Sequence, residues 1–213
     1  MGEIVPPSES CEIISLFPTF VWKQQLRSAE HEAHRAAVLA LLGAGPSRLP
    51  PLTSGESWQS GTALHRCPEL GGLVARFERT AAAVLVSLQM EAVRCQVTGC
   101  WANANAPGAS HPVHHHPNNF LSGVYYLRVG PGADTINFHD PRPQTGIIRP
   151  PITELSAHNT DQVVVRVQDG TLLVFPAYLE HSVSKNQGSD VRISVSFNAM
   201  FTDYAETISP PLW

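Results

Sequence analysis

Three histidines of this chain have the spacing of a mononuclear metal site. His114 and His116 lie within residues 111–117, and His181 follows far downstream. Residues i and i+2 of a strand point to the same face, so His114 and His116 can face one interior while His115 points away. Neutral imidazole binds iron, copper and zinc, and three protein ligands leave coordination positions free for a substrate or oxygen. A solvated histidine loop is the alternative.

An arginine and a serine follow the last of these histidines. Arg192 lies eleven positions after His181, a distance that suits a return to the same interior on the next strand. Arg192 and Ser194 are again i and i+2, and therefore share a face. A guanidinium group meets a carboxylate through two parallel hydrogen bonds, and a serine hydroxyl can add a third. We therefore expect an anion site here, whereas an isolated arginine on a strand would more often lie at the surface.

Short apolar and β-branched segments, separated by Gly, Pro, Asn and Asp, surround these residues, and each predicts a strand. The segments are 120–127, 163–167, 172–175 and 191–197. Several short strands separated by turns indicate an all-β barrel or jelly roll. The histidines are then expected to face its interior.

Two helices are expected before the strands. Apolar residues spaced by three and four predict one helix over residues 29–42, which Gly43 ends, and a second over residues 68–91. We expect both helices to cover the outside of the sheet. His31 and His34 lie three positions apart on the first helix, where we expect a solvated face rather than a second metal site.

The composition fits one domain of residues 1–213, in which residues 1–93 supply a strand and supporting helices and residues 94–213 the β-strand core. An apolar content of 43% allows a substantial core. A net charge of −4 and a pI of about 6.2 provide no general attraction to nucleic-acid phosphates or anionic membranes. Residues 43–61 and 142–159 are long irregular connections, and the second is placed to shape a substrate pocket.

The four cysteines have no C-x-x-C spacing, and we find neither a leader sequence nor an apolar run of membrane-spanning length. A reducing, cytoplasmic location is the simpler inference. Cys95 and Cys100 are expected to pack in or beside a strand as small hydrophobic residues.

Five segments, in order along the chain, resemble the 2-oxoglutarate/Fe(II) oxygenase family. They are W-x-N at residues 101–103, H-x-H-P followed by S-G-V-Y-Y within 114–127, F-x-D-P-R at 138–142, L-x-F-P-x-x-x-x-H-x-V at 173–183 and R-I-S-x-S-F-N at 192–198. Residues 16–19 resemble the opening strand of the family, and residues 58–60 a short element before its second helix. The resemblance covers nearly the whole chain, and it is specific for the family and weak for the substrate.

The resemblance implies a mainly β fold, namely a double-stranded β-helix (a jelly roll, cupin-like) with amino-terminal helices. It implies Fe(II) as the metal, with His114 and His181 as its first and last ligands. The middle position in this superfamily usually holds a carboxylate, but here it holds His116. Asp140 is the nearest acidic candidate downstream, and we expect it to be a turn residue instead.

The resemblance also implies 2-oxoglutarate as co-substrate. Arg192 and Ser194 would hold its far carboxylate, and Tyr126 and Asn103 would lie beside it. Tyr125, on the adjacent strand position, is expected to point the other way and to pack in the core.

The implied function is that of a non-haem Fe(II)- and 2-oxoglutarate-dependent dioxygenase, which hydroxylates a small or amino-acid-like molecule with molecular oxygen. Two alternatives stay open. One is a cupin-like three-histidine metalloenzyme that uses no 2-oxoglutarate, and the other is a non-catalytic β-barrel that binds a ligand. We expect no nucleic-acid or membrane partner, and the oligomeric state is open, with a homodimer as one option.

Overall fold

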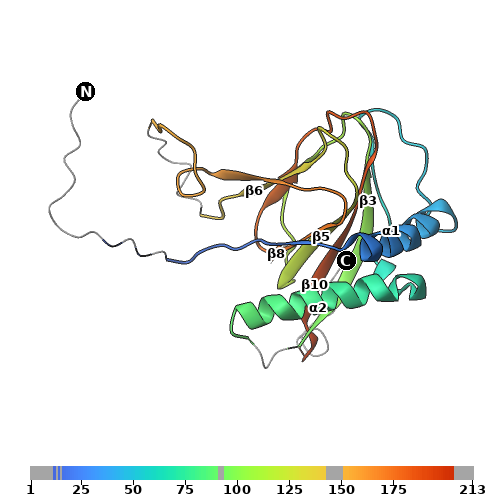
Figure 1. The fold of residues 1–213 in the computed structure, drawn as a ribbon, viewed down its shortest axis with the longest axis horizontal. Helices are drawn as coiled ribbons and strands as arrows, with labels where there is room; N and C mark the ends of the chain where they lie inside the picture. The colour runs from blue at the N-terminus through green and yellow to red at the C-terminus, as the bar shows by residue number, and fades with distance from the viewer. Residues whose placement is uncertain (1–11, 13, 15, 91–93, 143–150, 204–213) are drawn as a thin grey trace.

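The structure is a computed structural model that describes residues 12, 14, 16–90, 94–142 and 151–203. These residues form two antiparallel sheets, with two α-helices packed against one of them (Figure 1). The larger sheet has the strand order β1-β8-β5-β10-β3-β2, and the smaller sheet has the order β4-β9-β6-β7. The strands are β1 (Trp22–Gln25), β2 (Ser57–Gln59), β3 (Cys95–Asn105), β4 (His111–His114), β5 (Leu121–Arg128), β6 (Thr135–His139), β7 (Gln162–Arg166), β8 (Thr171–Pro176), β9 (His181–Val183) and β10 (Arg192–Phe201).

From β3 onward the chain crosses repeatedly between the two sheets. β3, β5, β8 and β10 belong to the larger sheet, while β4, β6, β7 and β9 belong to the smaller one. This arrangement is the double-stranded β-helix that the resemblance implies. The four strands predicted from apolar segments correspond to β5, β7, β8 and β10, and the short element predicted at residues 58–60 corresponds to β2. The space between the two sheets is the interior that the candidate residues were expected to face.

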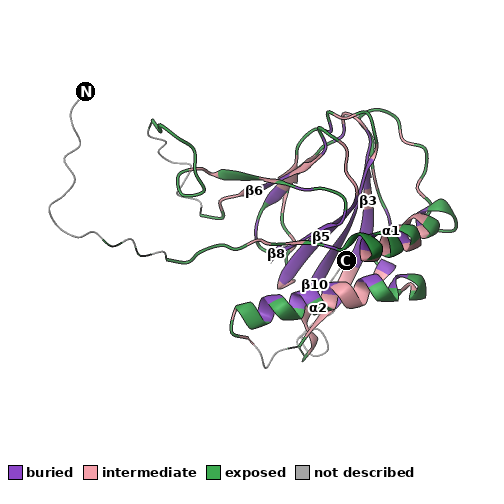
Figure 2. Cartoon of the chain, in the orientation of Figure 1, coloured by how far each residue is buried: buried purple, intermediate pink, exposed green. Residues whose placement is uncertain are grey.

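Two helices, α1 (Ser28–Gly43) and α2 (Gly71–Ser87), cover the outer face of the larger sheet, as predicted (Figures 1 and 2). Two short 3-10 turns, Leu64–Arg66 and Pro68–Leu70, precede α2. The second helix therefore begins slightly later than predicted and ends at Ser87, while the last predicted residue, Glu91, lies outside the described residues.

Close packing fixes α2 against the sheet. The Phe77 ring of α2 stacks on the Phe197 ring of β10, with ring centroids 4.1 Å apart. On the neighbouring strand, a Cβ atom at Gly123 would lie only 2.3 Å from the Phe197 ring. Gly123 is thus required for the close approach of this ring to β5.

The prediction of a solvated histidine face on α1 is wrong for His31. His31 is only 6% exposed, and its Nδ1 lies 2.7 Å from the Tyr125 hydroxyl oxygen. Tyr125 points out of the interior toward α1, while Tyr126 lines the inside, because neighbouring strand residues alternate in direction. The tyrosine hydroxyl therefore pairs with one nitrogen of the buried imidazole, while Nε2 has no hydrogen-bond partner among the described residues. His34 is half-buried, and its Nε2 lies 3.7 Å from a Glu30 carboxylate oxygen.

Residues 16–19 do not form the opening strand that the resemblance suggests. Phe17 is 93% exposed, and the first strand, β1, begins only at Trp22, which lies opposite Val174 of β8. Pro18 has no backbone N–H to donate to a ladder. The first strand, β1, therefore starts a few residues later than the resemblance suggests and closer to the first helix.

Two of the described cysteines pack within a strand of the larger sheet. Cys95 and Cys100 lie in β3, as predicted, and Cys100 is fully buried. Burial raises the pKa of the Cys95 thiol to about 11 and that of the Cys100 thiol to about 12, so both stay protonated and unreactive at neutral pH. Over the described residues, none of the helices combines the length and apolar character needed to cross a membrane.

Candidate metal centre

The strands that carry His114 and His181 are hydrogen-bonded neighbours at one edge of the smaller sheet. His114 lies directly opposite His181 in the register of β4 and β9. His116 follows β4 and lies outside any strand, where its backbone N–H donates to the Ala177 carbonyl oxygen at 2.9 Å. The strand pairing expected for His116 is therefore replaced by a contact to the turn between β8 and β9.

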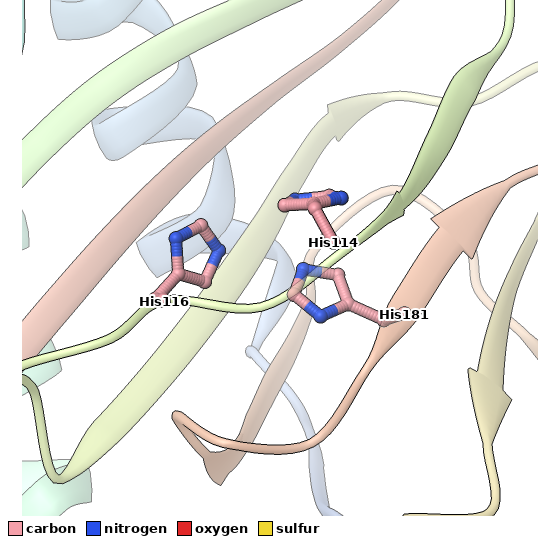
Figure 3. Close-up of side chains that lie close together, drawn as sticks. All are labelled: His114, His116 and His181. Carbon is pink, nitrogen blue, oxygen red and sulfur yellow. The ribbon is translucent and has the colours of Figure 1, made fainter.

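The three histidines nevertheless come together. Their candidate ligand atoms all lie within 4.8 Å of one another, and Figure 3 shows the three rings around a common space. The ring centroids of His114 and His181 are 4.2 Å apart, and the His116 centroid lies 5.1 Å from the first and 5.2 Å from the second. This is the group among the described residues that has the composition and spacing to hold a metal ion.

Backbone carbonyl groups fix the orientation of two of these rings. The Nδ1 of His114 lies 2.9 Å from the Pro112 carbonyl oxygen, and the Nδ1 of His181 lies 3.0 Å from that of Leu179. A carbonyl oxygen can only accept, so Nδ1 carries the proton in each neutral ring and Nε2 keeps its lone pair. Histidines that bind metal ions usually have their second nitrogen engaged in this way.

The surroundings favour the neutral form of two of the imidazoles, those of His116 and His181. Burial lowers the pKa of His116 to about 4 and that of His181 to about 3, and the neighbouring histidines lower both further. For His181 the hydrogen bond to Leu179 acts in the opposite direction without reversing the shift. Neutral imidazole is the form that coordinates a metal. His115, by contrast, is exposed at the rim of the site.

A cavity of about 300 Å³ lies beside the three histidines, and Arg192 forms part of its wall. Arg192 is only 3% exposed, and its guanidinium carbon lies 5.0 Å from the centre of the Tyr126 ring. The Nε of Arg192 and the hydroxyl of Tyr126 are buried and have no hydrogen-bond partner among the described residues. A buried cation without a counter-charge is costly. This wall is therefore suited to an anionic ligand.

Asn103, Ser194 and Tyr126 form one row across three adjacent strands of the larger sheet. Ser194 of β10 lies opposite Asn103 of β3 on one side and opposite Tyr126 of β5 on the other. The Asn103 Nδ2 donates to the Ser196 hydroxyl at 2.9 Å, which leaves its Oδ1 as an acceptor. Burial raises the pKa of Tyr126, although the Arg192 charge opposes this effect, so the hydroxyl remains a donor. All three members of the row line the cavity together with Arg192.

Asp140 is engaged away from the histidines. Its carboxylate accepts from the Nε and Nη2 of Arg142 at 2.9 and 2.7 Å, and from the Arg142 backbone N–H at 3.0 Å. These hydrogen bonds lower the pKa of Asp140. It is thus a turn residue, as predicted, and it does not belong to the group of candidate metal ligands.

Several residues of the cavity wall are not among the predicted site residues, and Trp101, Asn198 and His111 are three of them. The ring centroid of Trp101 lies 5.6 Å from that of His116. The Oδ1 of Asn198 accepts a hydrogen bond from the Ser122 hydroxyl at 2.8 Å. Strand alternation from Asn103 and Ser194 would have found both. His111 also lines the cavity, but alternation counts against it, because it lies three positions before His114.

Residues 99–198 match the model of the family described as "Putative 2OG-Fe(II) oxygenase". The matched segment begins in β3, ends in β10 and contains all the predicted metal and co-substrate residues. No curated protein matches the sequence.

Solved structures of similar fold cover most of this chain. The non-haem α-ketoglutarate-dependent epimerase SnoN from nogalamycin biosynthesis is 16% identical with a TM-score of 0.62, over 85% of this chain and 78% of its own. HygX from Streptomyces hygroscopicus, with nickel and 2-oxoglutarate bound, is 13% identical with a TM-score of 0.61, over 86% and 83%. A prolyl-4-hydroxylase from Pseudomonas putida is 15% identical with a TM-score of 0.57, over 85% and 93%.

At these identities the likeness to solved structures shows the fold alone, and the likeness to the family rests on the matched segment. Its boundaries enclose both the histidine cluster and the buried arginine wall described above. Over residues 99–198, which are 100 of its 213 residues, this chain is therefore similar to the 2OG-Fe(II) oxygenase family.

Proposed function

We propose that this protein is an oxygenase whose iron is held by His114, His116 and His181. We further propose that Arg192 and Ser194 hold the far carboxylate of 2-oxoglutarate, which is the one distant from its keto group. Tyr126 and Asn103 lie beside it. The observation that carries the proposal is the buried Arg192, which has no acidic partner among the described residues and shares one cavity with the three histidines.

The donor set fits a divalent first-row ion. Two of the rings have Nδ1 engaged with carbonyl oxygens and Nε2 available, and the burial of His116 and His181 favours the neutral form that binds metal. Because His116 stands where a carboxylate is usual, the protein ligands add no negative charge. The two negative charges of 2-oxoglutarate are then balanced by the metal and by Arg192.

When bound, iron together with 2-oxoglutarate and oxygen supplies the oxidation that replaces a substrate C–H bond by C–OH, while 2-oxoglutarate is converted to succinate and carbon dioxide. The residues of the chain orient and enclose the reactants. Arg192 would meet the far carboxylate with two parallel hydrogen bonds, the Ser194 hydroxyl would add a third, and the Tyr126 hydroxyl would donate to the same co-substrate beside them. Val124 and Ile136 add apolar surface to the cavity wall and help to exclude water.

The lining of the cavity indicates the chemistry of the substrate. Arg192 is the one permanently charged side chain among the described lining residues, and the other polar groups are imidazoles and neutral amides and hydroxyls such as those of Thr98, Asn119 and Asn198. An ammonium group would enter this cavity without a carboxylate to pair with, at the cost of burying an unpaired charge. We therefore propose a small neutral substrate that carries hydroxyl or amide groups, rather than a free amino acid.

Oxygen uptake coupled to succinate formation tests the proposed activity. Protein purified without oxygen and loaded with Fe(II) and 2-oxoglutarate should consume both co-substrates when a suitable neutral small molecule is added. His114→Ala should not, whereas His115→Ala is the matched control and should behave like the wild type. Metal binding without any binding of 2-oxoglutarate would favour the cupin-like enzyme, and ligand binding that survives removal of the metal would favour a non-catalytic barrel.

We also propose that residues 1–213 act as one domain in a reducing cytoplasm. The described cysteines Cys67, Cys95 and Cys100 are free thiols, which agrees with such a location. A homodimer remains a prediction, and light scattering of the purified protein at micromolar concentration tests it.

A further inference from the structure

The short strand β4 is irregular between His111 and His114. The two residues are three positions apart, so in a regular strand their side chains would point to opposite faces. The pairing of β4 with β9 shifts register between them, and their rings stack with centroids 4.3 Å apart and an angle of 18° between the planes. Such irregularities often redirect a side chain next to an active site.

The same irregularity places the Pro112 carbonyl oxygen 2.9 Å from the Nδ1 of His114. One distortion of the strand therefore supplies two contacts to the His114 ring, namely a hydrogen bond at its edge and an aromatic ring on its face. His111 is half-buried and lines the cavity, but it does not belong to the group of mutually close ligand atoms.

Each of the three candidate ligands has an aromatic neighbour of its own. The His181 ring lies 4.8 Å from that of Phe175, and the His116 ring lies 5.6 Å from that of Trp101. His114 is less buried than His181, and its corresponding neighbour is His111. An imidazole tolerates water at this partly exposed position better than a purely apolar ring does.

We propose that His111 is a positioning residue, which holds the His114 ring in the orientation for binding metal by stacking on its face. This inference rests on the proposed function, in which His114 is a ligand. Loss of the stacked ring frees the His114 side chain to rotate about its Cβ–Cγ bond and lets water reach its face. The Nε2 then points toward the metal position for only part of the time, and the affinity for the metal falls.

Metal affinity tests the inference without any need for catalysis. Calorimetric titration of the metal-free protein with Mn(II) or Ni(II) should give a dissociation constant about 10 to 100 times higher for His111→Ala than for the wild type, the range typical of residues that orient metal ligands. His111→Phe keeps a flat ring and should stay within about threefold of the wild type, since a ring face that stacks remains. His115→Ala is the matched control on the exposed neighbour.

Thermal unfolding of the metal-free variants separates a local effect from a loss of fold, because His111→Phe and His115→Ala should both unfold at the wild-type temperature. An unchanged metal affinity of His111→Ala would overturn the inference. So would a loss in His111→Phe as large as that in His111→Ala, since the ring nitrogens rather than the ring face would then matter. His114→Ala is titrated in parallel: if it retains the metal, the proposed function fails, and if it alone loses the metal, only the role of His111 fails.

Discussion

Replacing Arg192 by methionine removes the charge from the cavity wall and keeps a long side chain against Tyr126. A charge-assisted hydrogen bond contributes about 1.5–3 kcal/mol, so the variant should bind 2-oxoglutarate roughly 10 to 150 times more weakly at unchanged metal occupancy. Arg192 has no acidic partner in the described part of the chain and is 3% exposed. Its removal should therefore leave the free energy of unfolding of the ligand-free protein unchanged or higher.

Thermal unfolding with and without 2-oxoglutarate, alongside calorimetric titration, measures both effects. At a ligand concentration 100 times the wild-type dissociation constant, binding stabilises the folded state by about 2.7 kcal/mol, and a roughly thirtyfold weaker affinity reduces this to about 0.9 kcal/mol. Arg166→Met is the matched control, because Arg166 is exposed and pairs with Asp134 at 2.8 Å on the surface. Wild-type affinity of Arg192→Met for 2-oxoglutarate, with metal bound, refutes the assignment.

His181→Ala should abolish stoichiometric Fe(II) binding in a protein that stays folded, while the control His115→Ala should keep it. Metal analysis after anaerobic loading measures the occupancy, and circular dichroism checks the fold. Full metal occupancy in His181→Ala would contradict its role as a ligand. His116→Asp should still bind Fe(II), because it restores the commoner set of two histidines and one carboxylate; failure to bind metal in this folded variant counts against His116 as the third ligand. Gly123→Ala should lower the free energy of unfolding by about 1–3 kcal/mol or more, since its Cβ would lie 2.3 Å from the Phe197 ring; a denaturation curve with an unchanged midpoint argues against this packing.

Where the pairing between strands is regular, the alternation of side chains along a strand predicted correctly which residues face the cavity. Arg192 and Ser194 on β10 and Tyr126 on β5 all face the cavity, as a period of two requires. The same rule could not find His111, because the register of β4 shifts before His114. It also gave His116 a strand geometry that the residue does not have, since His116 is placed by a contact between two loops that are far apart in sequence.

Helix spacing predicted the two helices but not the buried face of α1. Small alanine side chains such as Ala33, Ala36 and Ala40 give little preference for any face, and all three are exposed. The buried residues of this helix are His31, Val38 and Leu42. The hydroxyl of Tyr125 makes a buried histidine acceptable at this position, and no pattern within the helix sequence reveals that partner.

The pairing of β4 has a consequence for the lifetime of the protein. β4 is an edge strand that pairs with β9 alone, at two register positions, and strands held this weakly open by local fluctuation. Because His114 and His181 face each other across this pair, an ion bound to both would act as a cross-link, and opening of the edge would require its release. Amide hydrogens of β4 should then exchange faster in metal-depleted protein, and proteases should cut there first. Degradation of the protein would thereby depend on how fully this site is loaded with metal.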